Sequence, residues 1–288
     1  MQLLLQYMAM ETKSVLITGC SSGIGKKSAE ILKNRGWRVF ATARKPEDVK
    51  HLLSLGFEAC RLDLEDSSSI HEAVDFVLSK TQNHLYGLVN NAGYGLTSAV
   101  EDINIADLRK QFEVNVFGLQ ELTNLLIPAF RKQGHGRIVN ISSVVGRFAL
   151  PYMGAYSASK FALEALTDVL RIELADTGIY VSLVEPGGIK TNFSKNALSV
   201  LDELKNKDTS FHSKAYEIIQ KGRKNNTKQN NKASTKSVVK TIIHALESKK
   251  PRARYLITPE AFFVFIAKKI LPETLIDSAV KLYTNKYK

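Results

Sequence analysis

The feature that most constrains the fold of this chain is a regular alternation of short, apolar, strand-like segments with helical patterns. Six strand-like segments cover residues 15–18, 38–42, 58–62, 87–90, 137–141 and 180–184. Strands that alternate with helices in this way predict a parallel sheet with helices on both of its faces. The chain has 288 residues, 44% of them hydrophobic, which is enough for one large α/β domain with a buried core.

A glycine-rich turn follows the first of these segments. Residues 18–25 read TGCSSGIG and stand between the apolar run Val15-Leu16-Ile17 and a helical pattern over residues 26–34. Glycines permit the tight turn and let the backbone approach a pyrophosphate, which the positive end of a helix dipole attracts. This strand, turn and helix context predicts a dinucleotide site. Its expected cofactor-binding residues are Gly19, Ser21, Ser22, Gly23, Ile24 and Gly25.

Tyr156 and Lys160 are four residues apart in a helical pattern, so they share one face of a helix. A free tyrosine has a pKa of about 10, and acid-base work near neutrality requires a nearby cation that stabilises its phenolate. Lys160 is that cation in this interpretation. The spacing alone is common on solvated helix faces, so other motifs have to decide between the two interpretations.

Five motifs, in order along the chain, resemble those of the short-chain dehydrogenase/reductase family of the compact type. They are the turn at 18–25, NNAG at 90–93, Asn115, the set Ser143, Tyr156 and Lys160, and PG at 186–187. The resemblance spans residues 13 to 191, with a looser match beyond, and its general look is nearest to hydroxysteroid and retinol dehydrogenase-like members. It implies a single Rossmann-type doubly wound parallel sheet of about seven strands, with the seventh near residues 254–258.

The resemblance also implies four catalytic residues: Asn115, Ser143, Tyr156 and Lys160. Ser143 precedes Tyr156 by the family's thirteen residues, and its neighbour Ser142 would point to the opposite side of the strand. We expect Ser143 to hold the substrate oxygen and Tyr156 to give it a proton. Lys160 would lower the pKa of Tyr156 and bind the nicotinamide ribose. Asn115 would hold a water in a proton relay, or it is a structural amide inside a helix.

The end of the second predicted strand favours NADP(H) over NAD(H) as the cofactor. NAD enzymes place a carboxylate there, whereas this chain has Ala43 followed by Arg44 and Lys45. An acid would repel a 2′-phosphate, while Arg44 can pair with it; the alternative is a solvent-facing loop charge. The resemblance adds further expected cofactor contacts: Asp63, Leu64, Asn90, Ala92, Gly93, Tyr156, Lys160, Pro186, Gly187, Ile189 and Thr191.

We expect a small, lipophilic substrate, such as a steroid, a retinoid or an aldehyde, whose carbonyl is reduced or whose alcohol is oxidised. The expected lining residues Tyr94, Phe148 and Phe193 are aromatic, which suits such a ligand, although apolar side chains beside a site can also be ordinary core. Residues 192–235 would form the substrate loop. The alternative function is a regulator that senses the cofactor on the same fold, for which loss of Tyr156 or Lys160 would be the signature.

Positive charge is concentrated in the C-terminal third of the chain. Residues 1–195 hold 21 Lys and Arg against 20 Asp and Glu, a net +1, whereas residues 196–288 hold 19 against 8, a net +11. With the apolar run at 261–271, this third could make peripheral contact with an anionic membrane. The alternative is a helix that covers the pocket or meets another subunit, with solubilising lysines. Nucleic-acid binding is not expected, because the charge lacks interleaved aromatic residues or a known reading module.

The remaining features set boundaries. We divide the chain into a leader, 1–12, a catalytic domain, 13–258, and a helical extension of the same domain, 259–288. Two cysteines, Cys20 and Cys60, form no disulfide framework, and the six histidines lack paired ligand spacing, so no metal is expected. No signal peptide or membrane span is recognised, which indicates a cytoplasmic protein. The resemblance implies a homo-oligomer built through the helices after Asn104 and Gly154.

Overall fold

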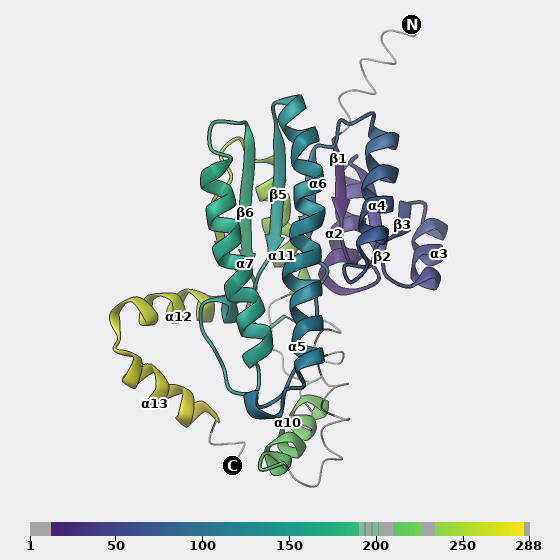
Figure 1. The fold of residues 1–288 in the computed structure, drawn as a ribbon. Helices are drawn as coiled ribbons and strands as arrows, with labels where there is room; N and C mark the ends of the chain where they lie inside the picture. Colours follow the sequence, from purple (N-terminus) through teal and green to yellow (C-terminus); the bar gives the residue numbers. More distant parts are fainter. Residues whose placement is uncertain are drawn as a thin grey trace, which may run out of the picture.

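A computed structural model describes residues 13–189, 193, 197, 201, 210–225 and 234–284. Seven parallel strands form one sheet in the order β3-β2-β1-β4-β5-β6-β7, so the chain reverses its direction of travel across the sheet between β1 and β4 (Figure 1). The strands are β1 (Ser14–Ile17), β2 (Arg38–Ala43), β3 (Glu58–Arg61), β4 (Gly87–Asn90), β5 (Gly136–Ile141), β6 (Ile179–Glu185) and β7 (Arg254–Leu256). The predicted doubly wound sheet is confirmed, and each predicted strand boundary lies within two residues of the observed one.

The described helices are α2 (Gly23–Asn34), α3 (Pro46–Ser54), α4 (Ser67–Thr81), α5 (Ile105–Phe112), α6 (Gly118–Gln133), α7 (Gly154–Glu173), α10 (Ser213–Asn225), α11 (Thr235–Glu247), α12 (Pro259–Ile270) and α13 (Glu273–Thr284). Six of them cover the two faces of the sheet. Helices α2, α3 and α11 pack on one face, and α4, α6 and α7 pack on the other. Figure 1 shows α6 and α7 side by side along β5 and β6.

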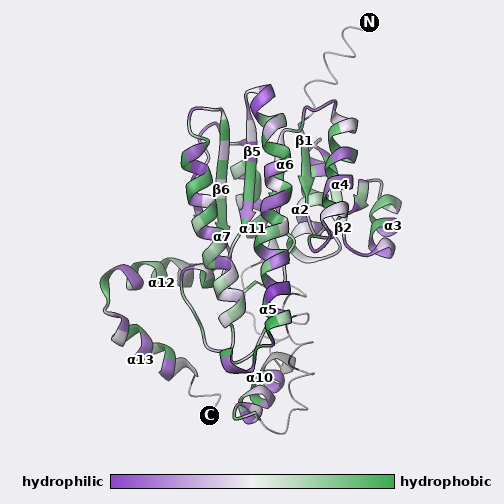
Figure 2. Ribbon diagram, in the orientation of Figure 1, coloured by the Kyte–Doolittle hydropathy of each residue, from purple (hydrophilic) through white to green (hydrophobic). Residues whose placement is uncertain are grey.

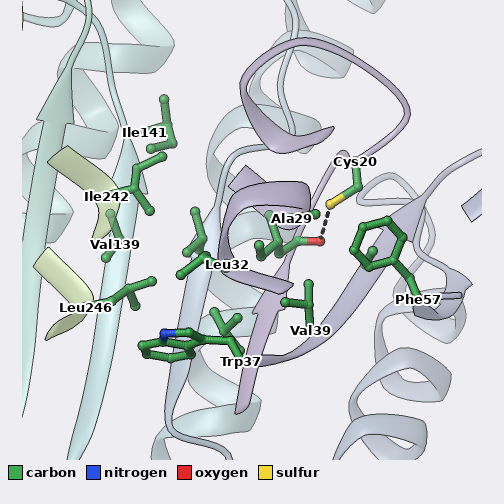
Figure 3. Packing of buried hydrophobic residues seen from close by; sticks show 14 of the residues in the cluster. Cys20, Ala29, Leu32, Trp37, Val39, Phe57, Val139, Ile141, Ile242 and Leu246 are labelled. Carbon is green, nitrogen blue, oxygen red and sulfur yellow. Dashed lines mark hydrogen bonds between the residues drawn. The ribbon is translucent and has the colours of Figure 1, made fainter. Parts of the chain in front are cut away.

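The core follows directly from the two-residue period of the strands. In β1, Val15 and Ile17 join the cluster beneath α2 and α11, whereas Leu16 joins the cluster beneath α4 and α6. Figure 3 shows the first cluster, in which Leu32 and Leu246 from the two helices meet strand residues such as Val139. Helices therefore exclude water from both faces of the sheet. Polar side chains of the strands reach solvent mainly near the strand ends.

One helix departs from regular geometry beside those strand ends. Between α5 and α6 the backbone forms a π-helical turn, η2 (Glu113–Phe117), and Asn115 lies inside it. Gly118 follows, and a Cβ atom there would come within 2.0 Å of the Leu64 carbonyl oxygen, so only glycine permits this close approach. Such π-turns occur often at functional sites because they reorient a few side chains without ending the helix.

The C-terminal extension consists of α12 and α13, which stand away from the sheet on the side of α7 (Figure 1). Figure 2 shows hydrophobic and hydrophilic residues side by side along both helices. Of the expected substrate loop, the structure describes Phe193, Ala197, Leu201, residues 210–225 and the start of α11; the rest of the loop, like the leader 1–12, lies outside the described residues. Within the described part of the chain, no helix is long and apolar enough to cross a membrane.

Candidate active site

The glycine-rich turn is fastened to the neighbouring strand β4 by one threonine. The Thr18 hydroxyl accepts hydrogen bonds from the backbone N–H groups of Asn91 (2.9 Å) and Ala92 (2.8 Å). In return, the Asn91 side chain donates to the Thr18 carbonyl oxygen at 2.8 Å and to that of Gly19 at 3.2 Å. Gly19 has φ +72°, and a Cβ on Gly25 would lie 2.3 Å from the Gly19 carbonyl oxygen. The turn is thus rigid and admits glycine alone at these two positions.

The residues present at the start of α2 fit a bound phosphate group. The helix begins at Gly23, whose φ is +61°, and the side chain of the N-cap residue Ser22 makes no capping hydrogen bond. The first turn of α2 contains no acidic residue. The first backbone N–H groups and the positive end of the helix dipole are therefore left for an anion. Ser21 is exposed, and Ile24 is partly buried against the core.

The ends of β2 and β3 carry the residues expected near the adenosine. Arg44 follows β2 with 58% of its side chain exposed, and its guanidinium lies 3.9 Å from Glu65. Asp63 follows β3, where Oδ1 accepts a hydrogen bond from the Glu65 N–H at 3.2 Å and Oδ2 accepts one from Arg61 at 3.3 Å. Leu64 is buried in the core. The Arg44 side chain is therefore exposed at the edge of the site, where it can pair with a further anion.

Tyr156 and Ser143 meet where α7 passes the end of β5. Tyr156 is buried and Ser143 forms a hydrogen bond with its side chain. The Ser143 hydroxyl also lies 3.5 Å from the carbonyl oxygen of Pro186, at the end of β6. Ser142 is buried beside Gly146. The structure thus brings Ser143, and not Ser142, to the tyrosine.

Burial dominates the electrostatics of this pair. It raises the pKa of Tyr156 to about 12, an effect that the Ser143 hydrogen bond opposes. It also lowers the pKa of Lys160 to about 8, against the influence of Glu164, one helical turn further on. Burial and Ser143 account for the pKa shift of Tyr156 in this structure, so the lowering of that pKa by Lys160 stays a prediction. The Lys160 ammonium donates to the Ile141 carbonyl oxygen at 2.8 Å and lies 5.9 Å from the centre of the Tyr156 ring.

Asn115 reaches the site from the π-turn. Its amide donates to the Tyr94 carbonyl oxygen (3.0 Å) and to the Ser159 hydroxyl (3.0 Å), and its Oδ1 accepts from the Tyr94 N–H (3.2 Å). A Cβ on Gly93 would lie 3.0 Å from that Oδ1 and 3.8 Å from the Lys160 ammonium nitrogen. Asn115 therefore joins the Tyr94 backbone to Ser159 on α7 and lies beside Lys160. Both roles considered from the sequence remain compatible with this geometry.

Two predicted residues have partners that the sequence did not indicate. The Asn90 side chain is buried and donates to Thr123 on α6 (2.9 Å) and to Asn140 on β5 (2.8 Å), so it joins β4 to both elements, and its cofactor contact stays a prediction. Tyr94, expected at the substrate, has Glu65, Asp107 and Arg44 as its charged neighbours. Its contact with the substrate stays a prediction.

The other predicted contacts follow the ends of β5 and β6. Pro186 is buried next to Ser143, Gly187 packs against Thr258, and Ile189 lies against the core. The Phe193 ring is centred 5.3 Å from that of Tyr156. Phe148 is half-buried beyond the short turn η3 (Val144–Gly146), and Thr191 lies outside the described residues.

A comparison with known families identifies this arrangement. Residues 13–201 match the model of the short chain dehydrogenase family. The chain belongs to this family. The oxidoreductase YbbO of Escherichia coli K12 is 40% identical over 269 residues, which cover 93% of this chain and 94% of that protein. The 17-beta-hydroxysteroid dehydrogenase type 6 of Rattus norvegicus is 36% identical, over 96% of this chain and 90% of that one.

Solved structures of short-chain dehydrogenases share the fold and hold nicotinamide cofactors of both kinds. An actinorhodin polyketide ketoreductase solved with NADPH is 28% identical, with a TM-score of 0.71 over 86% of this chain and 95% of that one. A Burkholderia phymatum protein solved with NAD is 24% identical, with a TM-score of 0.76 over 91% of this chain and 94% of that one. This short-chain dehydrogenase is accordingly an oxidoreductase with a nucleotide-binding site.

Several residues that shape the site of this short-chain dehydrogenase were not singled out from the sequence. The amide of Gln111 holds the backbone of Tyr94 and Leu96, and Ser159 bridges Asn115 and the Tyr156 carbonyl oxygen. Asn91 stood within a recognised motif, but its bonds to the glycine turn depend on the pairing of β1 with β4. No pattern in the sequence separates such amides from solvated ones.

Replacement of Thr18 by valine tests the fastening of the turn. Thr18→Val keeps the shape of the side chain but leaves the N–H groups of Asn91 and Ala92 without their acceptor. We expect the free energy of unfolding to fall by about 1–3 kcal/mol and the affinity for a nicotinamide dinucleotide to fall about tenfold. Urea unfolding and cofactor fluorescence titration measure the two effects. Thr18→Ser, which keeps the acceptor, should lose much less; an equal loss in both variants would contradict this account.

Proposed function

We propose that this short-chain dehydrogenase is a cytoplasmic NADP(H)-dependent oxidoreductase that reduces the carbonyl of a small lipophilic substrate, or oxidises the corresponding alcohol, with Tyr156 as proton donor. The observation that carries the proposal is the convergence of four side chains at the carboxyl edge of the sheet. They are Asn115, Ser143, Tyr156 and Lys160, which come from η2, the end of β5 and α7. This is the edge at which open α/β sheets bind their ligands.

The proposed mechanism follows from the protonation states of these residues. The reduced nicotinamide cofactor, when bound, supplies a hydride to the carbonyl carbon. Tyr156, whose pKa is raised to about 12, keeps its proton at neutral pH and gives it to the substrate oxygen. Ser143 donates a hydrogen bond to the same oxygen as charge develops on it. After this transfer Tyr156 is a phenolate, which the Lys160 ammonium stabilises. Lys160, which lies beside Asn115, then returns a proton to Tyr156.

The two pKa shifts set the protonation states of Tyr156 and Lys160 near neutral pH. Burial disfavours the charged forms of both groups, so Tyr156 holds its proton more firmly than a free phenol. Lys160 releases its proton more readily, because its pKa is lowered to about 8. Below that pH the lysine is charged and can support the phenolate. Reduction is therefore expected to weaken as the pH rises through about 8.

The proposed preference for NADP(H) rests on the end of β2. Ala43 closes the strand, and the exposed Arg44 and Lys45 follow it where NAD enzymes carry a carboxylate. Within the part of the chain that the structure describes, the one ion pair of Arg44 is with the Glu65 carboxylate, at 3.9 Å. A 2′-phosphate placed there would gain a charge-assisted hydrogen bond.

The proposed substrate class rests on the apolar surroundings of Tyr156. The Phe193 ring lies against the tyrosine, and Gly95 leaves the space that both rings occupy: a Cβ there would be 3.0 Å from Phe193 and 3.4 Å from Tyr156. An apolar wall beside the proton donor favours a ligand with a large hydrocarbon body. The similarity to a protein named as a 17-beta-hydroxysteroid dehydrogenase supports the same class.

The first test is turnover by the wild-type protein and by Tyr156→Phe. We expect oxidation of NADPH with at least one member of a panel of steroid, retinoid, aliphatic and aromatic carbonyls. Loss of the hydroxyl should lower kcat by a factor of about 100 or more, while the NADPH affinity stays within about twofold. Tyr180→Phe, on the outer part of β6, is the matched control and should retain its activity. NADPH binding without turnover of any carbonyl would instead favour a cofactor-sensing regulator.

A second test addresses the choice of cofactor. In Arg44→Ala we expect KM for NADPH to rise about tenfold, because one charge-assisted hydrogen bond is lost, with little change in KM for NADH. Lys45→Ala removes the adjacent exposed cation and should have a smaller effect. Equal changes for both cofactors would show that Arg44 does not read the 2′-phosphate.

We also propose that the protein is a homo-oligomer that contacts an anionic membrane through α12 and α13. Apolar side chains are exposed on α5, η2 and α7, a face suited to a second subunit; they are Ile105, Phe117, Leu166, Val169 and Ile172. A separate apolar set is exposed on α12 and α13, where Lys268, Lys269 and Lys281 accompany it; it comprises Phe262, Phe263, Ile266, Ile270, Leu271, Leu275 and Leu282. Apolar residues flanked by cations match an anionic bilayer surface.

The roles of the two surfaces can be tested separately by placing one negative charge on each surface. Phe263→Asp should abolish flotation with phosphatidylserine-containing vesicles and leave the sedimentation coefficient unchanged. Ile172→Asp should shift sedimentation toward the monomer and leave flotation unchanged. A wild-type protein that sediments as a monomer would refute the first surface, and a failure to float even at low salt would refute the second.

A further inference from the structure

A partly buried ion-pair cluster lies on α7 next to Lys160, and the mechanism above does not use it. It consists of Arg147, Glu164, Asp168, Glu185 and Arg254. Arg254 pairs with Glu164 and Asp168 through its two terminal nitrogens, and it donates to Glu185 at 2.9 Å. The Arg147 Nε lies 3.5 Å from Glu164 and 3.6 Å from Glu185. The side chains of Glu164 and Glu185 are 7% and 0% exposed.

This cluster is adjacent to Lys160. Glu164 follows Lys160 by four residues on α7, which places the two side chains on one face about 6 Å apart along the helix axis. Gly146 lies between them: a Cβ there would be 3.1 Å from the Glu164 Cγ and 3.2 Å from the Lys160 Cβ. The Lys160 ammonium itself is buried and donates to the Ile141 carbonyl oxygen. A neutral carbonyl compensates a buried charge poorly, so the nearest carboxylate matters to its protonation.

The cluster has one more carboxylate than it has guanidinium groups, and the Lys160 ammonium can balance this negative charge. Three carboxylates face two guanidinium groups, so the cluster has a formal charge of −1 when every carboxyl is ionised. Burial and the Glu164 charge raise the pKa of Glu185. The titratable groups around Lys160 are then Tyr156 and Glu164 on α7, Arg147 after η3, Glu185 on β6 and Arg254 on β7. Glu164 is the anion among them that raises the pKa of Lys160.

Helix α12 closes the cluster from outside. The Phe265 ring is centred 4.7 Å from the Arg147 guanidinium carbon, and Lys268 donates to the Arg147 carbonyl oxygen at 2.9 Å. Phe265, Lys268 and Lys269 form one wall of a cavity of about 370 Å³ whose other walls carry Glu164, Glu185 and Arg254. This helix follows the residues 13–201 that match the family model. The contact is therefore supplied by this chain's C-terminal extension.

We propose that Glu164 is a positioning residue for proton transfer: its carboxylate, held by Arg147 and Arg254, keeps the Lys160 ammonium charged beside Tyr156. Helix α12 supports this arrangement through Arg147. The proposal rests on the proposed function, since Lys160 must be charged to stabilise the Tyr156 phenolate. The C-terminal extension thereby influences the charge of Lys160 through Arg147 and Glu164.

The test is the titration of Lys160 in three forms of the full-length protein: wild type, Glu164→Gln and Asp168→Asn. Protein labelled with ¹³C at the lysine ε carbon gives a Lys160 signal, which is identified by its absence in Lys160→Arg. In Glu164→Gln we expect the midpoint of this titration to fall by about one pH unit, because a charge one turn away is removed. The loss of kcat at high pH should move down by the same amount.

Asp168→Asn is the matched control. It removes another carboxylate from the same Arg254 but lies two turns, about 12 Å along the axis, from Lys160. Its midpoint should move by less than about a third of the shift in Glu164→Gln, although both variants disturb the ion pairs. Equal shifts in the two variants, or none in Glu164→Gln, would overturn the proposal. A shift of the Lys160 signal without activity toward any carbonyl would refute the proposed function and leave the charge coupling intact.

The contribution of α12 is tested on the same signal. Phe265→Ala removes the ring that packs on Arg147 and should lower the midpoint in the same direction as Glu164→Gln, by a smaller amount. Phe262→Ala, whose side chain is 57% exposed on the same helix, should leave the midpoint unchanged. An identical response of the two phenylalanine variants would refute the role of α12.

Discussion

The candidate site depends on the fact that both faces of the sheet are buried under helices. A strand residue that points to either face enters one of two apolar clusters, as the split of Val15, Leu16 and Ile17 between them illustrates. Polar groups with chemistry to perform must therefore emerge where the strands end. All strands are parallel, so these ends gather at one edge, where the glycine turn meets Asn91 and Ser143 meets Pro186 although the partners are distant in the sequence.

Burial then sets the chemistry of that edge. Tyr156 and Lys160 lie on the buried face of α7, and removal from water raises the pKa of the phenol and lowers that of the ammonium. Each shift favours a neutral group, as desolvation requires. The result is a donor that retains its proton and a lysine that titrates near pH 8. Three groups reduce the free-energy penalty of burying the charged forms of Tyr156 and Lys160. They are the carbonyl of Ile141, the hydroxyl of Ser143 and the carboxylate of Glu164.

The sequence predicted the strands well because each combines an apolar run with a turn signal, and these local features survive in the folded protein. Ser143 was distinguished from Ser142 by its spacing to Tyr156, and the structure does bring Ser143 to the tyrosine. The partners of amide side chains could not be predicted in this way. Asn90 and Asn91 are adjacent in one motif, yet the first bonds to Thr123 and Asn140 and the second fastens the glycine turn. The predicted substrate contact of Tyr94 stays a prediction.

By itself, the sequence determined the fold class, the identity of the glycine turn and the spacing of the tyrosine, lysine and serine, because these follow from local periodicity and short-range geometry. Tertiary structure decided what surrounds those groups. The π-turn that presents Asn115, the approach of Gly118 to Leu64 and the ion pairs that join Arg254 to Glu164 connect segments between 44 and 90 residues apart, or depend on such packing. A pKa responds to the burial and the charges that this packing creates, and neither is encoded in any short stretch of the chain.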